Sequence, residues 1–149
     1  MAHYLQQETG AFHTLTGSDF TTSIQSLSAF LSSDVLSTGA TTFPVGPVVT
    51  LGSTGTWLVI GTVSYTDTAA AREVASCITD GTVNYASGAG AVSVAGFWGS
   101  TSLSAIVVST SANIYISART SAGSATFSMV SNKSNCGFDT SITAVRLVG

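Results

Sequence analysis

The residues with the greatest potential for metal or acid–base chemistry are few and widely spaced. His3 and His13 have no carboxylate at the spacing that a zinc site needs, and isolated histidines are more often solvated or packing residues. Asp67, Asp80 and Asp139 each stand at the end of a strand-like segment, where aspartate is a typical turn residue. A Ca²⁺ site needs several oxygen ligands brought together, and scattered aspartates are a weak basis for one. We therefore predict no metal site and no cofactor.

Motifs for hydrolysis or phosphate binding are also lacking. None of the many serines lies in a G-x-S-x-G turn, and no carboxylate pair suggests the acid and base of a glycosidase. The glycine-containing stretches at 80–81 and 88–90 precede no helix of the kind that binds phosphate. The sequence accordingly predicts no catalytic residues and a protein that is not an enzyme.

The most distinctive chemical group is an aromatic pair, Phe97 and Trp98, between Gly96 and Gly99. Exposed aromatic side chains can contact another subunit or stack on a sugar. The same pair could instead plug one end of the fold, because large aromatic side chains are mostly buried. We favour a plug or a subunit contact over a ligand platform, and we name Phe97 and Trp98 as subunit-interface or ligand-facing candidates.

The two cysteines, Cys77 and Cys136, are too few for a disulfide framework. Cys77 alternates with Ala75 and Thr79 in a strand-like segment, which favours a buried thiol. Cys136 lies in a polar loop. A bridge between the two cysteines is the alternative, although synthesis in a cytoplasm disfavours it.

Charged residues are scarce. They make up only 7% of the chain, against roughly 25% in an ordinary globular domain, while hydrophobic residues reach 44% and allow a substantial core. Serine and threonine occupy the surface that lysine and glutamate usually fill, so little like-charge repulsion separates copies of the chain. This composition favours a subunit of an assembly, with a hydroxyl-rich secreted or virion all-β protein as the alternative.

Several partners are disfavoured by the same composition. The net charge is −3 and the four basic residues are scattered, so we expect no nucleic-acid partner. No apolar run reaches the roughly 18 residues that a membrane span needs, and we expect no membrane insertion. The N-terminal stretch lacks the basic and apolar regions of a signal peptide. We therefore expect synthesis in a cytoplasm.

Gly55–Asp67 is the stretch around which the fold is organised. Its odd-numbered and even-numbered positions fall on opposite faces of a strand. β-Branched and aromatic residues dominate, as a pleated and partly buried surface favours. The face predicted to enter the core consists of Trp57, Val59, Val63 and Tyr65.

Strand-like segments continue along the chain from residue 41, with turn residues between them. Asp80–Gly81 is a strong hairpin signal, and we predict a second hairpin across Thr110–Ser111. Short strands at intervals of about 8 to 12 residues are typical of a sandwich or barrel. The predicted strands are residues 43–51, 55–67, 72–80, 82–86, 91–95, 101–109, 112–120, 124–131 and 140–149, with a flexible loop at 87–90.

Residues 1–38 differ from the domain predicted at 39–149, and we interpret them as an N-terminal attachment segment. An apolar stripe at spacings of three and four residues predicts a helix there. The intervening serines and threonines are poor helix formers, so the stripe must pack on another chain or fold back on its own domain. The stripe consists of Phe20, Ile24, Leu27, Leu31 and Val35, of which the first four are our docking candidates.

Three stretches together resemble a known family. They are GTWLVIGTVSYTD at Gly55–Asp67, SLSAIVVSTSANIYISART at Ser102–Thr120 and DTSITAVRLVG at Asp139–Gly149. In this order and spacing they resemble the C1q/TNF-like jelly-roll domains of bacteriophage virion proteins, over residues 40–149. The chain departs from the wider family in having no collagen-like stalk, no long fibre shaft and no acidic cluster for Ca²⁺.

The resemblance implies an all-β, two-sheet antiparallel jelly-roll sandwich that assembles as a homotrimer on a virion surface. Its partner would be the major capsid protein or another virion protein, bound through the N-terminal segment in a capsid decoration or short head spike. The alternative is a receptor-binding tip of a tail fibre that recognises a host surface glycan or protein. Its binding loops would come from residues 84–90, 96–100 or 131–138.

Overall fold

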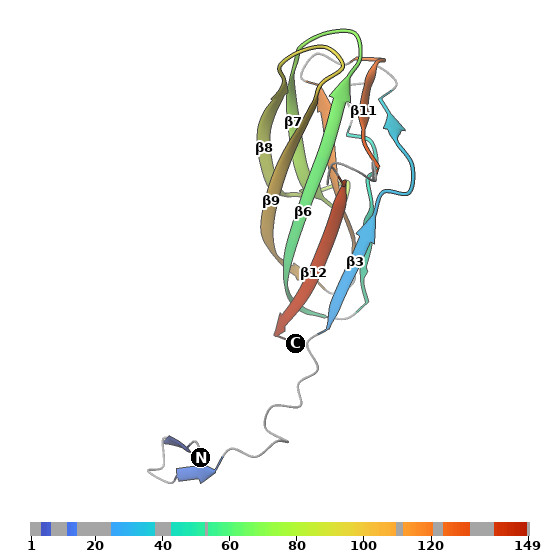
Figure 1. The fold of residues 1–149 in the computed structure, drawn as a ribbon. Helices are drawn as coiled ribbons and strands as arrows, with labels where there is room; N and C mark the ends of the chain where they lie inside the picture. The colour runs from blue at the N-terminus through green and yellow to red at the C-terminus, as the bar shows by residue number, and fades with distance from the viewer. Residues whose placement is uncertain are drawn as a thin grey trace.

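Figure 1 shows the computed structural model of the chain as an elongated sandwich of β-strands. The structure describes residues 4–6, 12–14, 25–37, 43–52, 54–109, 112–120, 124–131 and 139–148. Within these residues there is no helix with the length and apolar character needed to cross a bilayer.

The strands form two principal sheets. One has the order β3 (Ser26–Phe30), β12 (Ser141–Val148), β6 (Gly55–Asp67) and β9 (Trp98–Ser109). Two short strands, β11 (Phe127–Met129) and β4 (Val35–Leu36), extend it beside the C-terminal end of β6. The other sheet has the order β5 (Val48–Leu51), β10 (Ala112–Thr120), β7 (Arg72–Thr79) and β8 (Asn84–Val92). A separate pair consists of β1 (Tyr4–Gln6) and β2 (Phe12–Thr14).

The strand order is that of a jelly roll. The chain passes from one sheet to the other between β4 and β5, β5 and β6, β6 and β7, β8 and β9, β9 and β10, and β10 and β11. The strand nearest the start of the sandwich, β3, therefore lies beside β12, and every pairing among the described strands is antiparallel. Two antiparallel sheets joined by such crossings define a double-sheet jelly roll. This confirms the fold class predicted from the sequence.

The longest strand, β6, delivers the core face that its alternation predicts. Trp57, Val59 and Val63 are fully buried and Tyr65 is nearly so. Each of these side chains points between the sheets, where apolar residues from the facing strands meet them. The facing residues include Leu51, Val74, Ile78, Ile114, Ile116 and Ala118. The predicted core face is therefore confirmed.

The predicted N-terminal helix is wrong in the part that the structure describes. Residues 26–30 form β3, which pairs with β12 through contacts such as Leu27 with Ala144. Leu27 and Leu31 are half-buried against the core of their own domain. The serines around them are poor helix formers, and pairing with β12 satisfies their backbone groups. The sandwich thus includes residues from Ser26 onwards, ahead of the predicted boundary at residue 39, whereas Phe20 and Ile24 lie outside the described residues.

Two strand connections also differ from the prediction. The expected hairpin across Thr110–Ser111 does not form, because β9 pairs with β6 while β10 pairs with β5 and β7 in the other sheet. The predicted flexible loop at 87–90 is instead the middle of β8. Its glycines allow close approach: a Cβ at Gly88 would lie 2.8 Å from Leu103 Cδ2, and one at Gly90 would collide with the Tyr65 hydroxyl.

Other local predictions hold. β7 and β8 form the hairpin that Asp80–Gly81 predicts, with Gly81 at a φ of 93°. Cys77 is a buried free thiol, and burial raises its pKa to about 11 although the nearby Arg119 charge acts in the opposite direction. Cys136 lies outside the described residues.

Gly61 provides a test of the intersheet spacing. A Cβ added there would lie 2.7 Å from Cδ1 of the buried Ile116 on the opposite sheet. We expect Gly61→Ala to lower the free energy of unfolding by about 1–3 kcal/mol, because overpacking forces neighbouring side chains out of position. Urea denaturation would measure this loss.

The matched control is Gly52→Ala, where an added Cβ meets nothing within 4 Å. We expect that control to be neutral or slightly stabilising. Adding Ile116→Val to Gly61→Ala removes Cδ1 and should recover part of the loss. An unchanged stability of Gly61→Ala would contradict the proposed close packing.

Candidate functional site: two interaction surfaces

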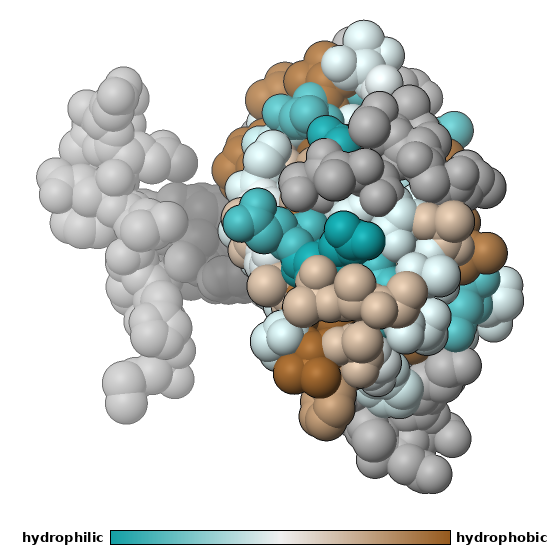
Figure 2. All heavy atoms as spheres, turned by 90° about the horizontal axis from the view of Figure 1, so that it is seen from above, coloured by the Kyte–Doolittle hydropathy of each residue, from teal (hydrophilic) through white to brown (hydrophobic). Residues whose placement is uncertain are grey.

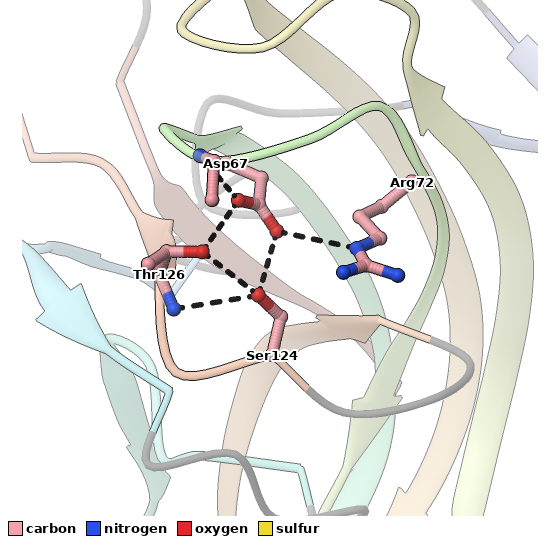
Figure 3. A network of polar contacts seen from close by, with 5 residues as sticks. Asp67, Arg72, Ser124 and Thr126 are labelled. Carbon is pink, nitrogen blue, oxygen red and sulfur yellow. Dashed lines mark hydrogen bonds and ion pairs between the residues drawn. The ribbon is translucent and has the colours of Figure 1, made fainter.

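A buried carboxylate organises the end of the sandwich at which β6 finishes. Asp67 is the last residue of β6 and its side chain is fully buried. The hydroxyls of Ser124 and Thr126 donate to its two carboxylate oxygens at 2.7 Å each, as Figure 3 shows. The backbone N–H of Ala69 donates to it at 3.0 Å. One side chain thus joins the turn after β6 to the turn before β11.

The charge of Asp67 is maintained by its hydrogen bonds. Burial alone would raise the pKa of this carboxyl, but hydrogen bonds from Thr126, Ala69, Ser124 and Ala70 outweigh burial and hold the pKa below its usual value. The Arg72 Nε lies 3.8 Å from an Asp67 oxygen (Figure 3). Because 41% of the Arg72 side chain is exposed, we treat this ion pair as a minor contribution.

The β8–β9 turn is attached to the same strand end. The backbone N–H of Gly96 donates to the Asp67 carbonyl at 2.7 Å, and the Thr66 hydroxyl donates to the Phe97 carbonyl at 3.0 Å. Gly96 has a φ of 77°, a conformation that favours glycine. Three turns, at residues 68–71, 93–97 and 124–126, therefore converge on the end of β6. We call them the apical turns.

The apical turns expose apolar side chains. Phe97 is 66% and Val94 53% exposed, and Trp98 at the start of β9 is 37% exposed. Figure 2 views this end from above and shows hydrophilic side chains near its middle with hydrophobic ones towards its border. Phe97 therefore does not plug the sandwich, and the contact role named for Phe97 and Trp98 remains a prediction.

A second surface is the outer face of the sheet β3–β12–β6–β9. Residues on this face alternate with the buried ones, and none at these outward positions is charged. The two charged residues of the four strands, Asp67 and Arg146, share the register positions of the core-facing residues. We call this surface the uncharged face.

The uncharged face has a hydroxyl half and an apolar half. In the hydroxyl half, which also carries the exposed Phe30, Thr62 bonds Ser102 across β6 and β9 at 2.9 Å. In the row of Ile60, where the two halves meet, Ser28 bonds Thr143 across β3 and β12 at 2.9 Å. In the apolar half, nearer the start of β6, the side chains lie in adjacent register rows across three strands. The exposed members are Ile60 at 46%, Ile106 at 56% and Val108 at 76%, with Leu58 and Val145 half-buried between them.

The opposite sheet gives a contrast. Its outer positions include two charged residues. Glu73 lies two positions before Ala75 on β7, and Arg119 on β10 pairs with Ala75. Arg119 packs its guanidinium 4.8 Å above the Phe43 ring. Within the described residues, charged side chains are therefore absent from the outer face of one sheet and present on the outer face of the other.

Sequence reasoning found only part of these surfaces. It identified Phe97 and Trp98, and it recognised Asp67 as a turn residue. It missed Ile60, Ile106 and Val108, although their alternation with core residues was visible, because the sequence does not show which strands share a sheet. The docking candidates Leu27 and Leu31 contact the core of their own domain.

Comparisons with known proteins add similarities of shape. The chain matches no protein-family model and no curated protein. Among solved structures, an Eiger TNF from S. frugiperda is 14% identical, with a TM-score of 0.49 over 82% of this chain and 92% of that one. The infectious bursal disease virus Gt strain structure is 10% identical, with a TM-score of 0.40 over 97% of this chain and 42% of that chain. A CBM6 domain of LamC from Zobellia galactanivorans is 12% identical, with a TM-score of 0.35 over 82% and 100%.

Similarities at these levels carry no conclusion about function. The strand order itself defines the class: the chain is a two-sheet, antiparallel jelly-roll domain. Within that class, its described features are a closely tied apical end and one sheet face without charge.

The Asp67 junction can be tested by Asp67→Asn. The folded pKa of Asp67 is lower than its usual value, so the ionised carboxylate stabilises the fold above about pH 4. This contribution is lost as the pH falls through the folded pKa. We expect the variant to lose about 1–3 kcal/mol at pH 7, and the difference from the parent to shrink in strong acid. Denaturation curves at several pH values would measure it.

Glu73→Gln is the matched control, because it removes one negative charge from an exposed position on the adjoining strand β7. We expect its stability to remain within about 0.5 kcal/mol of the parent. Equal pH profiles for the parent and Asp67→Asn would contradict the junction role.

Proposed function

We propose that the protein is a non-enzymatic structural component of a bacteriophage virion. It forms a homotrimer through the uncharged face and is attached to the particle through its N-terminal segment. The observation that carries this proposal is a whole sheet face without charge, half of it apolar. The sequence resemblance to phage C1q/TNF-like domains supports the trimer and the virion location.

Burial against another copy of the chain would remove the apolar side chains of the uncharged face from water. Ile106 and Val108 expose more than half of their surface, and apolar area removed from water contributes roughly 25 cal/mol per Å². Contiguous exposed apolar patches on soluble proteins commonly mark interaction sites. A standard specific interface buries about 1,600 Å². The adjoining hydroxyl half adds hydrogen-bonding groups without the cost of burying a charge.

The two ends of the sandwich suit different roles. At the start of β6, Gln25 accepts a hydrogen bond from the backbone N–H of Arg146, so β3 begins beside the end of β12. The apical turns lie at the other end of β6, about 40 Å away for a 13-residue strand (Figure 1). A subunit held through the residues before Gln25 can therefore present its apical turns away from the attachment. Three copies would add avidity to a weak individual grip.

Of the virion roles that the resemblance implies, we propose a capsid decoration or short head spike. A decoration protein that binds only the assembled shell would stabilise it. The partner would be the major capsid protein or another virion protein.

A second candidate function is receptor binding at the tip of a tail fibre. The exposed Phe97 and Val94, held on turns tied to Asp67, favour it. Rigid aromatic contacts bind with little ordering cost. Images of an intact particle would separate the two candidates: subunits at capsid symmetry positions support decoration, and subunits at the tail end support receptor binding.

The trimer can be tested by Ile106→Lys, which would place one charge per subunit in the apolar contact. An unpaired buried charge costs several kcal/mol, so the variant should become monomeric at micromolar concentration while the parent remains trimeric. Native mass spectrometry would measure both, with 15.0 kDa as the mass of one chain. Val83→Lys is the control, because Val83 is 48% exposed in the β7–β8 turn, outside the uncharged face. This variant should stay trimeric. A monomeric parent would rule out this assembly.

The attachment role can be tested by deleting residues 1–24. The deletion spares Gln25 and the whole of β3, whose pairing with β12 belongs to the sandwich. We expect the shortened protein to keep its fold and trimeric mass but to lose binding to particles that lack their own copies. Co-sedimentation with such particles would measure binding. Retained binding would exclude the N-terminal segment as the attachment.

A further inference from the structure

The turn between β7 and β8 places an aspartate directly before an exposed glycine. Asp80 is partly exposed, and Gly81, Thr82 and Val83 are exposed. Glycine offers the least steric hindrance of any residue to an approach of its backbone nitrogen. Asp80–Gly81 is therefore the described peptide link where an aspartyl side chain has the least hindered access to the following amide.

Three donors hold the Asp80 carboxylate. The backbone N–H groups of Thr82 and Val83 donate to Oδ1 at 2.8 and 2.7 Å. The Tyr85 hydroxyl donates to Oδ2 at 2.7 Å. The bonds from Val83, Tyr85 and Thr82 keep the pKa of Asp80 below its usual value, although burial acts weakly against them. Both carboxylate oxygens are engaged, and the ionised form is favoured.

The neighbouring amide is held as well. The backbone N–H of Gly81 donates to the Thr79 hydroxyl oxygen at 3.0 Å, and that hydroxyl donates to the Val83 carbonyl at 2.8 Å. Gly81 has a φ of 93°, which a side chain would strain. The two groups that could react with each other, a carboxyl and the next backbone nitrogen, are thus fixed by separate partners within one turn.

The reaction open to these groups is cyclisation of aspartate. The Gly81 nitrogen attacks Asp80 Cγ, an N–Cγ bond forms, and the Cγ–OH bond of the protonated carboxyl breaks. The nitrogen proton leaves with that hydroxyl as water. Water then cleaves the ring at the main-chain carbonyl, which leaves Gly81 linked through Cγ as isoaspartate. The net composition is unchanged and no oxidant or reductant takes part.

We propose that Asp80–Gly81 is a modification site for isoaspartate formation, and that Tyr85 is a positioning residue that keeps it slow in the folded protein. The hydrogen bond from the Tyr85 hydroxyl disfavours protonation of Asp80 Oδ2 and opposes rotation of the carboxyl towards the Gly81 amide. Isoaspartate would add one backbone carbon to the turn between β7 and β8, and the ladder between these two strands sets the register of their pairing. The proposal does not depend on the trimer or on the particle.

The test compares isoaspartate at residue 80 in the parent and in Tyr85→Phe during prolonged incubation at 37 °C and neutral pH. Peptide mapping by mass spectrometry after digestion separates the two linkages. Loss of one hydrogen bond to a charged group corresponds to about a tenfold change, so we expect roughly tenfold faster accumulation in Tyr85→Phe. Both rates should rise as the pH is lowered towards 5, and the rise in Tyr85→Phe should level off at a higher pH, because its Asp80 carboxyl lacks one of the bonds that lower the pKa.

Tyr115→Phe is the matched control. The Tyr115 hydroxyl lies near Gly81, 3.3 Å from where its Cβ would be, but it makes no hydrogen bond to Asp80. We expect it to react at the parent rate. Equal rates for the parent and a folded Tyr85→Phe overturn the role of Tyr85. If Tyr85→Phe does not fold, the rate of isoaspartate formation in the native parent is compared with the rate in the parent unfolded by urea. Similar rates overturn the protection by the turn, and a faster rate in urea supports it.

Discussion

The pairing of β6 with its neighbours is the constraint on which the rest of the structure depends. β9 pairs with β6 along almost its whole length on one edge, and β12 and β11 share the other edge. A slip of one residue in either register would move Trp57 and Val59 out of the core and bring Leu58 and Ile60 into it. The core face and the uncharged face are therefore fixed together by the same backbone hydrogen bonds.

The end of β6 shows how a single polar side chain can organise distant parts of the chain. Ser124 and Thr126 lie 57 and 59 residues from Asp67 in sequence, yet both donate to its carboxylate. A carboxylate without these donors would be expensive to bury. With them, the turn before β11 is tied to β6, and the backbone bond to Gly96 brings the β8–β9 turn to the same place. The exposed Phe97 therefore lies on a turn that hydrogen bonds hold against the end of β6.

Much of the fold was predictable from local pattern, and the failures share one cause. The core face of β6 and the Asp80–Gly81 hairpin follow from alternation and turn chemistry within a few residues. Leu27 and Leu31 fit a helical spacing as well as they fit a strand, so the local pattern predicts a helix over Ser26–Phe30. The pairing with β12 decides for a strand, and that partner is more than 100 residues away. The same limit hid the separate sheets of β9 and β10, the junction at Asp67 and the uncharged face. Each depends on long-range contacts that a local pattern does not contain.

The seam between β8 and β9 has an evolutionary consequence. Tyr65 is accommodated there because Gly90 and Gly99 lack side chains; a Cβ at Gly99 would lie 2.6 Å from the tyrosine ring. The Tyr65 hydroxyl also bonds Thr101 at 3.0 Å. A sequence that replaces one of these glycines must shrink or move the tyrosine, and a larger residue at position 65 is excluded while both glycines remain. These three positions are therefore expected to vary together among related chains, as a co-varying group that an alignment can detect without any knowledge of function.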